Sequence, residues 1–191
     1  GKTIIVQLNR LGAKLVILDK SEEKLLEIQK GTDKESVSYF AFDIYENSEI
    51  EPNIKKIIEE CGVFDGFVYC AGVGGVRPLS FTKLTFAQQI MNANLYTFVE
   101  IVRCITRKNC FAKGGSIVAI SSISSIKGLK SKIAYSASKA ALDSAVRCMA
   151  AELSERGIRV NSILKGWVET DMQQDFIKNN MELNSGDDLK R

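Results

Sequence analysis

A tyrosine and a lysine four residues apart are the side chains of this sequence best suited to acid–base chemistry. Tyr135 and Lys139 lie in the segment 131–143, whose composition predicts the opening of a helix. In an α-helix, residues four positions apart lie on one face at about 6 Å, so both side chains can reach the same ligand. A phenol titrates at about pH 10, and a nearby ammonium lowers that pKa. The pair therefore predicts a proton donor beside a cation, with a structural tyrosine and a solvated lysine as the alternative for this spacing alone.

Composition removes several competing chemistries. The sequence contains no histidine, which excludes imidazole catalysis, histidine-based triads and histidine-ligated metal sites. The cysteines are odd in number and form no C-x-x-C motif, so we expect reduced, buried thiols of a cytoplasmic protein and no metal site. They stand at positions 61, 70, 104, 110 and 148.

Length and charge favour one globular domain with a small-molecule substrate. The chain has 191 residues, 45% of them hydrophobic, which is enough for a single core. The net charge is +3, and acidic and basic residues alternate along the chain, so neither nucleic acid nor a membrane surface is an expected partner. No apolar run approaches the length of a membrane span.

Strand-like and helix-like segments alternate along the chain and predict the elements that position the pair. Such alternation is typical of an α/β fold with a doubly wound parallel sheet, three layers and helices on both faces, in which ligands bind at the carboxyl ends of the strands. Strands are predicted at 13–19, 37–43, 64–72, 115–122 and 158–164, and helices at 1–12, after 21, at 47–61, over 82–113 with a junction near 92–94, and at 135–157.

Two further polar residues complete a recognisable set. Ser122 ends a predicted strand 13 residues before Tyr135, and Asn94 stands 28 residues before that serine. The set resembles the short-chain dehydrogenase/reductase family in its single-domain form, similar to the 3-oxoacyl-carrier reductases. The resemblance implies hydride transfer between NAD(P)H and a carbonyl or alcohol. It assigns substrate binding to Ser122, proton transfer to Tyr135, ribose binding and pKa control to Lys139, and a relay water to Asn94.

The serine assignment depends on register alone. Ser121, Ser124 and Ser125 are neighbours that compete with Ser122 for the same role. A cofactor-binding protein that has lost catalysis and acts as a sensor or scaffold is the alternative function. It is motivated by two departures from the family pattern, at Cys70 and Lys165.

The resemblance also predicts a dinucleotide site. Asp19 ends a strand where such folds bind the adenosine ribose, and its charge repels the 2′-phosphate of NADP, so NAD is the expected cofactor. Lys20 weakens that preference and keeps NADP as the alternative. The alternative interpretation of Asp19 is an aspartate that only starts a turn. Asp43 matches the family's adenine-binding aspartate. The remaining predicted cofactor residues are Gly1, Ala71, Gly72, Tyr135, Lys139, Gly166, Val168 and Thr170.

The ends of the sequence carry further expectations. The family places a first strand and a glycine-rich turn immediately before Gly1, so the single oxidoreductase domain 1–191 is interpreted as incomplete at both ends. Gly1-Lys2-Thr3 as the tail of a P-loop is a weaker alternative. Residues 171–191 have the polar composition of a substrate lid. The long apolar helices predict a homodimer or homotetramer, and the substrate is a carbonyl or alcohol that is either free or carrier-linked.

Overall fold

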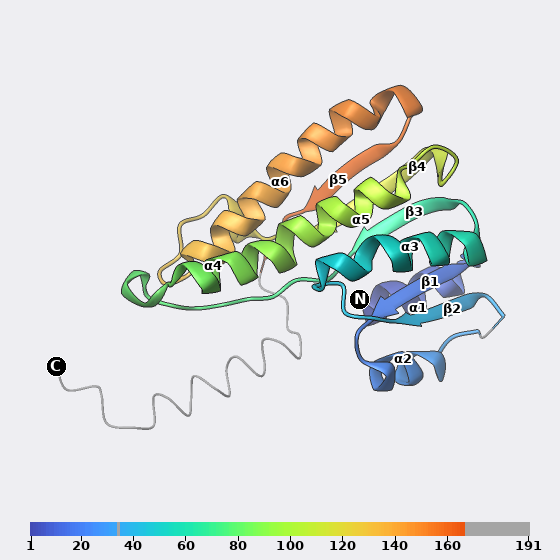
Figure 1. The fold of residues 1–191 in the computed structure, drawn as a ribbon, viewed down its shortest axis with the longest axis horizontal. Coiled ribbons are helices and arrows are strands. Elements are labelled where there is room, and N and C mark those ends of the chain that lie inside the picture. Colours follow the sequence, from blue (N-terminus) through green and yellow to red (C-terminus); the bar gives the residue numbers. More distant parts are fainter. Residues whose placement is uncertain (34, 167–191) are drawn as a thin grey trace.

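Parallel strands alternate with helices along the chain, as the sequence predicts (Figure 1). This computed structural model describes residues 1–33 and 35–166. The main elements are α1 (Lys2–Arg10), β1 (Leu15–Asp19), α2 (Glu22–Gln29), β2 (Val37–Ala41), α3 (Asn47–Cys61), β3 (Phe64–Tyr69), α4 (Leu84–Met91), η2 (Asn92–Tyr96), α5 (Thr97–Ile105), β4 (Phe111–Ile120), η3 (Ile123–Ser125), α6 (Ile133–Leu153) and β5 (Arg159–Ile163). The α/β prediction is confirmed.

The strands form two parallel groups whose carboxyl ends point the same way (Figure 1). β1 pairs with β2, with Leu15 opposite Val37. In the second group β4 lies between β3 and β5, and Ala119 lies opposite both Tyr69 and Ser162. Residues that follow the strands therefore gather along one edge, where ligands bind in folds of this type.

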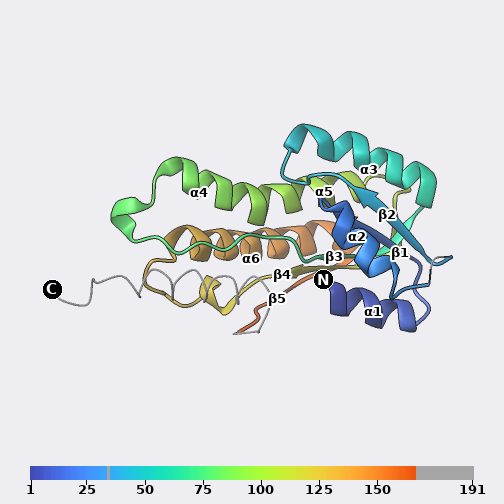
Figure 2. The same ribbon diagram turned by 90° about the horizontal axis from the view of Figure 1, so that it is seen from below.

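Helices cover both faces of the strands. α3, α5 and α6 lie on one side and α1 on the other (Figure 2). Strand β1 shows why, because its side chains alternate between faces. Ile17 packs with Leu25 of α2 and Ile5 of α1, whereas Val16 and Leu18 pack against the larger core on the opposite side.

The larger core is built from helical stripes packed onto β3 and β4. Ile50, Ile54 and Ile57 are buried on α3 at helical spacing. They share one hydrophobic cluster with Phe98 of α5 and Ile117 of β4. This packing fixes α5 and its junction with α4 over the strands that carry the site.

Local signals near the amino terminus act as expected. Gly12 follows α1 with φ of 82°, the left-handed conformation that favours glycine after a helix. The Ser21 hydroxyl accepts a hydrogen bond from the Lys24 amide at 3.3 Å and caps α2. Asp19 accepts from the Ser21 amide at 2.9 Å, so the carboxylate is held directly at the end of β1.

One predicted boundary is wrong. The sequence pattern predicts helix up to 113, but α5 ends at Ile105 and β4 already begins at Phe111. Asn109 adopts φ of 66°, a left-handed conformation that asparagine tolerates, and the chain reverses there. Phe111 then enters the buried strand. Within the described residues, no helix is long and apolar enough to cross a membrane.

Candidate active site

Asn94 lies where α4 meets α5, in the π-helical segment η2. The side chain is completely buried. Its Oδ1 accepts from the Val73 amide at 2.8 Å, and its Nδ2 donates to the Val73 carbonyl at 3.0 Å and to Ser138 Oγ at 2.9 Å. Both amide protons are therefore used, and Asn94 ties the turn after β3 to helix α6.

The turn after β3 approaches this asparagine so closely that only glycine fits at position 72. A β-carbon placed on Gly72 would lie 2.8 Å from Asn94 Oδ1 and 3.4 Å from Lys139 Nζ. Any larger residue would therefore displace the asparagine or the lysine. The predicted cofactor contact Gly72 and two of the predicted catalytic residues thus meet at one point, as the fold would require of a shared site.

Lys139 is buried, with only 4% of its surface exposed. Its Nζ donates to the Ile120 carbonyl at 2.8 Å, at the carboxyl end of β4, and lies 6.0 Å from the centre of the Tyr135 ring. Burial lowers the pKa of Lys139 to about 8; the nearby charge of Lys165 acts in the same direction and that of Asp143 opposes it. The ammonium therefore exchanges protons close to neutral pH.

A second cation accompanies the tyrosine. Lys132 Nζ lies 5.9 Å from the centre of the Tyr135 ring. The sequence analysis did not single out this residue. A lysine directly before the helix is its only sequence signal, and it is a common feature of helices without a catalytic role.

The serines after β4 differ in their surroundings. Ser121 is fully buried, and its amide donates to the Ile163 carbonyl at 2.9 Å. Ser122 is 8% exposed, and its hydroxyl accepts from the Ser124 amide at 3.2 Å as the cap of η3. Successive residues of an extended chain point to opposite sides, so Ser121 and Ser122 face different environments. Ser122 follows the Lys139 partner Ile120 by two residues, which places it at the same strand end.

The two predicted adenosine-binding carboxylates follow neighbouring parallel strands. Asp19 ends β1, and Asp43 lies two residues beyond β2. Asp43 Oδ1 accepts from the Tyr45 amide at 3.0 Å, and its Oδ2 pairs with Lys20 Nζ at 3.4 Å. The lysine that weakens the NAD prediction is thus paired with an acid at this edge.

Tyr45 connects this end of the site to η2, and sequence reasoning missed it. Asn92 Nδ2 donates to the Tyr45 backbone carbonyl at 3.0 Å, and the Tyr45 amide donates to Asp43 Oδ1. Burial, together with the charges of Asp43 and Asp19, raises the pKa of Tyr45, so the phenol stays protonated. An aromatic residue two positions after Asp43 was its only sequence signal.

A second tyrosine fixes the end of β3. Tyr69 is buried, and its hydroxyl donates to the Ala93 carbonyl at 2.6 Å. Tyr69 therefore ties the end of β3 to η2.

The remaining predicted cofactor residues are only partly placed. A β-carbon on Gly1 would lie 3.9 Å from the β-carbon of Cys70, so the start of α1 adjoins the end of β3. Ala71 packs against the main core, and Gly166 is exposed after β5. Val168 and Thr170 lie outside the described residues.

The cysteine prediction is half right. All five thiols are free, but only Cys104 is buried, and Cys70 and Cys148 are exposed. Cys70 lies in the turn after β3 and Cys148 on the outward face of α6, two places where apolar sequence context does not imply burial.

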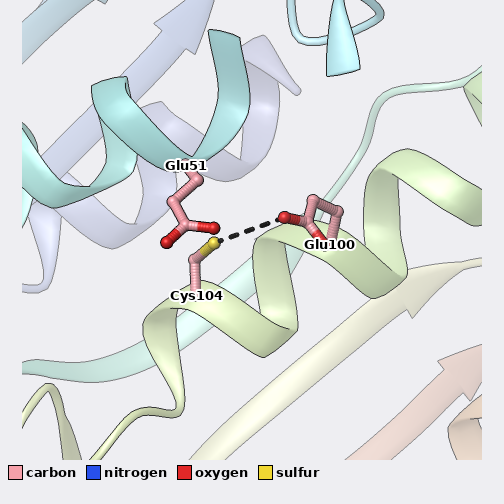
Figure 3. A group of neighbouring side chains, drawn as sticks. All are labelled: Glu51, Glu100 and Cys104. Carbon is pink, nitrogen blue, oxygen red and sulfur yellow. Dashed lines mark hydrogen bonds between the residues drawn. The ribbon is translucent and has the colours of Figure 1, made fainter. Parts of the chain in front are cut away.

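One cluster outside the site contains potential metal ligands. Glu51, Glu100 and Cys104 bring three such atoms within 4.8 Å of one another (Figure 3). Arg103 Nε donates to Glu100 at 2.8 Å, and Arg107 pairs with Glu51 at 2.5 Å. The guanidinium groups lower the pKa of both glutamates. The cluster is an ion-pair network that joins α3 to α5, with its negative charge already neutralised.

Comparisons with known proteins give the family. A family model described as "Enoyl-(Acyl carrier protein) reductase" matches residues 1–188. L-xylulose reductase of Caenorhabditis elegans is 31% identical over 178 residues, which cover 92% of this chain and 70% of that protein. The chain belongs to the short-chain dehydrogenase/reductase family.

Other relatives of this short-chain dehydrogenase/reductase agree. The 3-oxoacyl-acyl-carrier-protein reductase FabG of Vibrio harveyi is 30% identical over 132 residues, 69% of this chain and 54% of that protein. A solved structure named "ElxO with NADP Bound" has a TM-score of 0.83 at 23% identity, covers 95% of this chain and 74% of that one, and shows the shared fold. The resemblance inferred from Ser122, Tyr135, Lys139 and Asn94 is thereby confirmed at the level of the family, which is one of oxidoreductases.

The burial of Lys139 predicts that the free energy of unfolding depends on pH. The pKa of Lys139 is about 8 in the folded chain and 10.5 for a free lysine. The buried charge therefore lowers the free energy of unfolding below pH 8, and this loss disappears as the pH rises from 8 to 10.5. We expect the free energy of unfolding of the wild type, taken relative to that of Lys139→Met at the same pH, to rise by about 2–3 kcal/mol between pH 7 and pH 10.

Urea unfolding at both pH values measures this difference. Lys132→Met is the matched control, because it removes a less buried lysine beside the same tyrosine. A stability difference between the wild type and Lys139→Met that stays constant from pH 7 to pH 10 would show that burial does not lower the pKa of Lys139.

Proposed function

We propose that this chain transfers a hydride between NAD(P)H and a carbonyl or alcohol substrate. The observation that carries the proposal is the meeting of Gly72, Asn94 and the buried Lys139 ammonium beside Tyr135, at the carboxyl ends of β3 and β4. Such a place binds dinucleotides in doubly wound folds. The glycine turn and the cation fit the ribose on the nicotinamide side of the cofactor. The two strand-end carboxylates fit the adenosine side.

Each residue of the proposed catalytic group has a role that its surroundings support. Ser122 binds the substrate oxygen from the end of β4. Tyr135 donates its phenolic proton to that oxygen in reduction and accepts it in oxidation. Lys139 binds ribose hydroxyls and favours the phenolate through its charge. Asn94 holds the turn, and its Oδ1 keeps capacity for one further hydrogen bond, suited to a relay water. The bound nicotinamide supplies or accepts the hydride.

The tyrosine is the residue on which turnover depends most directly. Tyr135→Phe removes the transferable proton and keeps the ring, so we expect kcat to fall by at least about a thousandfold while cofactor affinity changes less than about threefold. Steady-state kinetics together with NADH fluorescence titration measure both quantities. Tyr96→Phe, which changes an exposed tyrosine at the end of η2, is the matched control.

Two outcomes would contradict this assignment. Retained turnover in Tyr135→Phe would remove the phenol from the mechanism. A wild-type protein that binds NADH but turns over no member of a broad carbonyl panel would favour the sensor or scaffold alternative.

For the cofactor we propose NAD over NADP, although the related ElxO structure contains NADP. Asp19 is held at the end of β1 by the Ser21 amide, and Lys20 is drawn towards Asp43. A fixed carboxylate with its neighbouring cation already paired disfavours a 2′-phosphate.

The preference is measurable as a ratio of kcat/KM values. We expect NADH to exceed NADPH by at least about tenfold, and Asp19→Asn to reduce that ratio by about tenfold or more because the repulsive charge is lost. Asp65→Asn on β3, far along the strand from the site, serves as control. A wild-type preference for NADPH would overturn the assignment.

The default substrate that we propose is a 3-oxoacyl thioester, because FabG relatives are named as 3-oxoacyl-acyl-carrier-protein reductases. Ketones and sugars complete the panel, since L-xylulose reductase is another relative. We further propose a cytoplasmic location, which the five free thiols support.

For assembly we propose a homodimer or homotetramer through the helices from α4 to α6. Large apolar side chains are exposed along them, including Leu84 at 72%, Tyr96 at 52% and Ile133 at 52%. Sedimentation equilibrium should therefore give a mass of two or four chains, falling towards the monomer when Tyr96 is replaced by Asp. A monomeric mass for the wild type would refute the assembly.

A further inference from the structure

Only two charged side chains are buried within residues 1–33 and 35–166, and they lie one helical turn apart. Lys139 is 4% exposed and Asp143 is 7% exposed, and both belong to α6. Residues at this spacing share a helix face, so Tyr135, Lys139 and Asp143 form a single stripe on α6. The first two belong to the proposed catalytic group, and the third has no role so far.

A buried carboxylate needs a partner that offsets its lost hydration. In the described part of the chain, Asp143 Oδ1 has no hydrogen-bond partner. An isolated buried carboxylate is strongly unfavourable unless a cation compensates for it. The cation available is Lys139, whose charge interacts with that of Asp143.

The other groups around the lysine do not replace this carboxylate. Lys165, which follows β5, repels the Lys139 ammonium. Ile120 of β4 contributes a neutral carbonyl, and Tyr135 a neutral phenol at 6.0 Å. From η2, Asn94 contributes an uncharged side chain that approaches Gly72, as Lys139 Nζ does. Among these, only Asp143 carries a negative charge.

We propose that Asp143 is a positioning residue for hydride transfer, whose buried carboxylate keeps the Lys139 ammonium charged and in place beneath Tyr135. The inference rests on the proposed function and deepens it, because it names the group that controls the lysine. Asp143 touches neither substrate nor cofactor and acts only through Lys139.

The proposal has a definite consequence for pH dependence. Burial and Lys165 already lower the pKa of Lys139 to about 8. Loss of the Asp143 charge lowers that pKa further, so the ammonium is deprotonated at a lower pH. Activity that needs the ammonium then declines at lower pH in the variant, while activity well below the pKa is nearly unchanged.

The test is Asp143→Asn, which keeps the shape and removes the charge. We expect the alkaline limb of kcat/KM to move by about one pH unit towards acid, with a loss of about three- to tenfold at pH 8 and less than about twofold at pH 6.5. Glu152→Gln, an exposed acid on the same helix, should leave the profile at its wild-type position.

A readout without cofactor or substrate separates the two proposals. The Lys139 13Cε resonance, followed against pH in the lysine-labelled apo protein, should titrate about one unit lower in Asp143→Asn than in the wild type. An unchanged titration and an unchanged pH limb would overturn the role of Asp143 even if the wild type is active. A wild type without turnover, but with the titration shift, would overturn the proposed function and leave the pairing intact.

If Asp143→Asn folds too poorly for kinetics, a comparison of stabilities still tests the proposal. Urea midpoints of Asp143→Asn in the wild-type and Lys139→Met backgrounds test whether the two charges interact. We expect the substitution to lower the midpoint in the wild type, where it leaves an ammonium alone, and to raise it in Lys139→Met, where it removes a lone carboxylate. Equal midpoint shifts in both backgrounds would overturn the pairing.

Discussion

A buried ammonium group at the carboxyl end of β4 is the constraint on which the site depends. Lys139 loses nearly all of its hydration and regains one hydrogen bond, which its Nζ donates to the Ile120 carbonyl. This arrangement is unfavourable for folding but useful for chemistry, because a poorly solvated cation acts strongly on nearby groups. The surroundings hold it there: a glycine turn that leaves room for Nζ, a helix packed on the strand end, and one buried carboxylate.

Asn94 converts this local arrangement into a rigid unit. Its three hydrogen bonds join η2, the turn after β3 and helix α6, which are far apart in the sequence. The π-helical register at η2 turns the side chain towards that turn. Tyr45 extends the connection from η2 towards Asp43, because its carbonyl accepts from Asn92 and its amide donates to Asp43. The adenosine end and the catalytic end of the site are therefore linked through η2, whose position both ends share.

The sequence predicts those features of the fold and the site that depend on residues close together along the chain. Local rules predict α3 over 47–61, the Ser21 cap and the helix junction at Asn94, because these depend on neighbours along the chain. The family resemblance adds the residues of the site. Contacts that depend on packing were not predictable: the Tyr45 link, the burial of Asp143 and the exposure of Cys70. The end of α5 was missed because no glycine or proline marks it: the helix ends before Thr106, and the left-handed residue of the following turn is Asn109.

Helix α6 shows how one element meets both structural and chemical demands. One face carries Tyr135, Lys139 and Asp143, while Leu142 and Val146 are buried in the core. Small residues between the polar ones let the helix approach β4 and η2, and Ser138 uses that closeness to accept from Asn94. A larger residue at 138 would separate α6 from η2 and release the turn that Asn94 holds. The spacing of small residues on α6 is therefore as necessary to the chemistry as the tyrosine and the lysine, because it sets the distance between the helix and the strand ends.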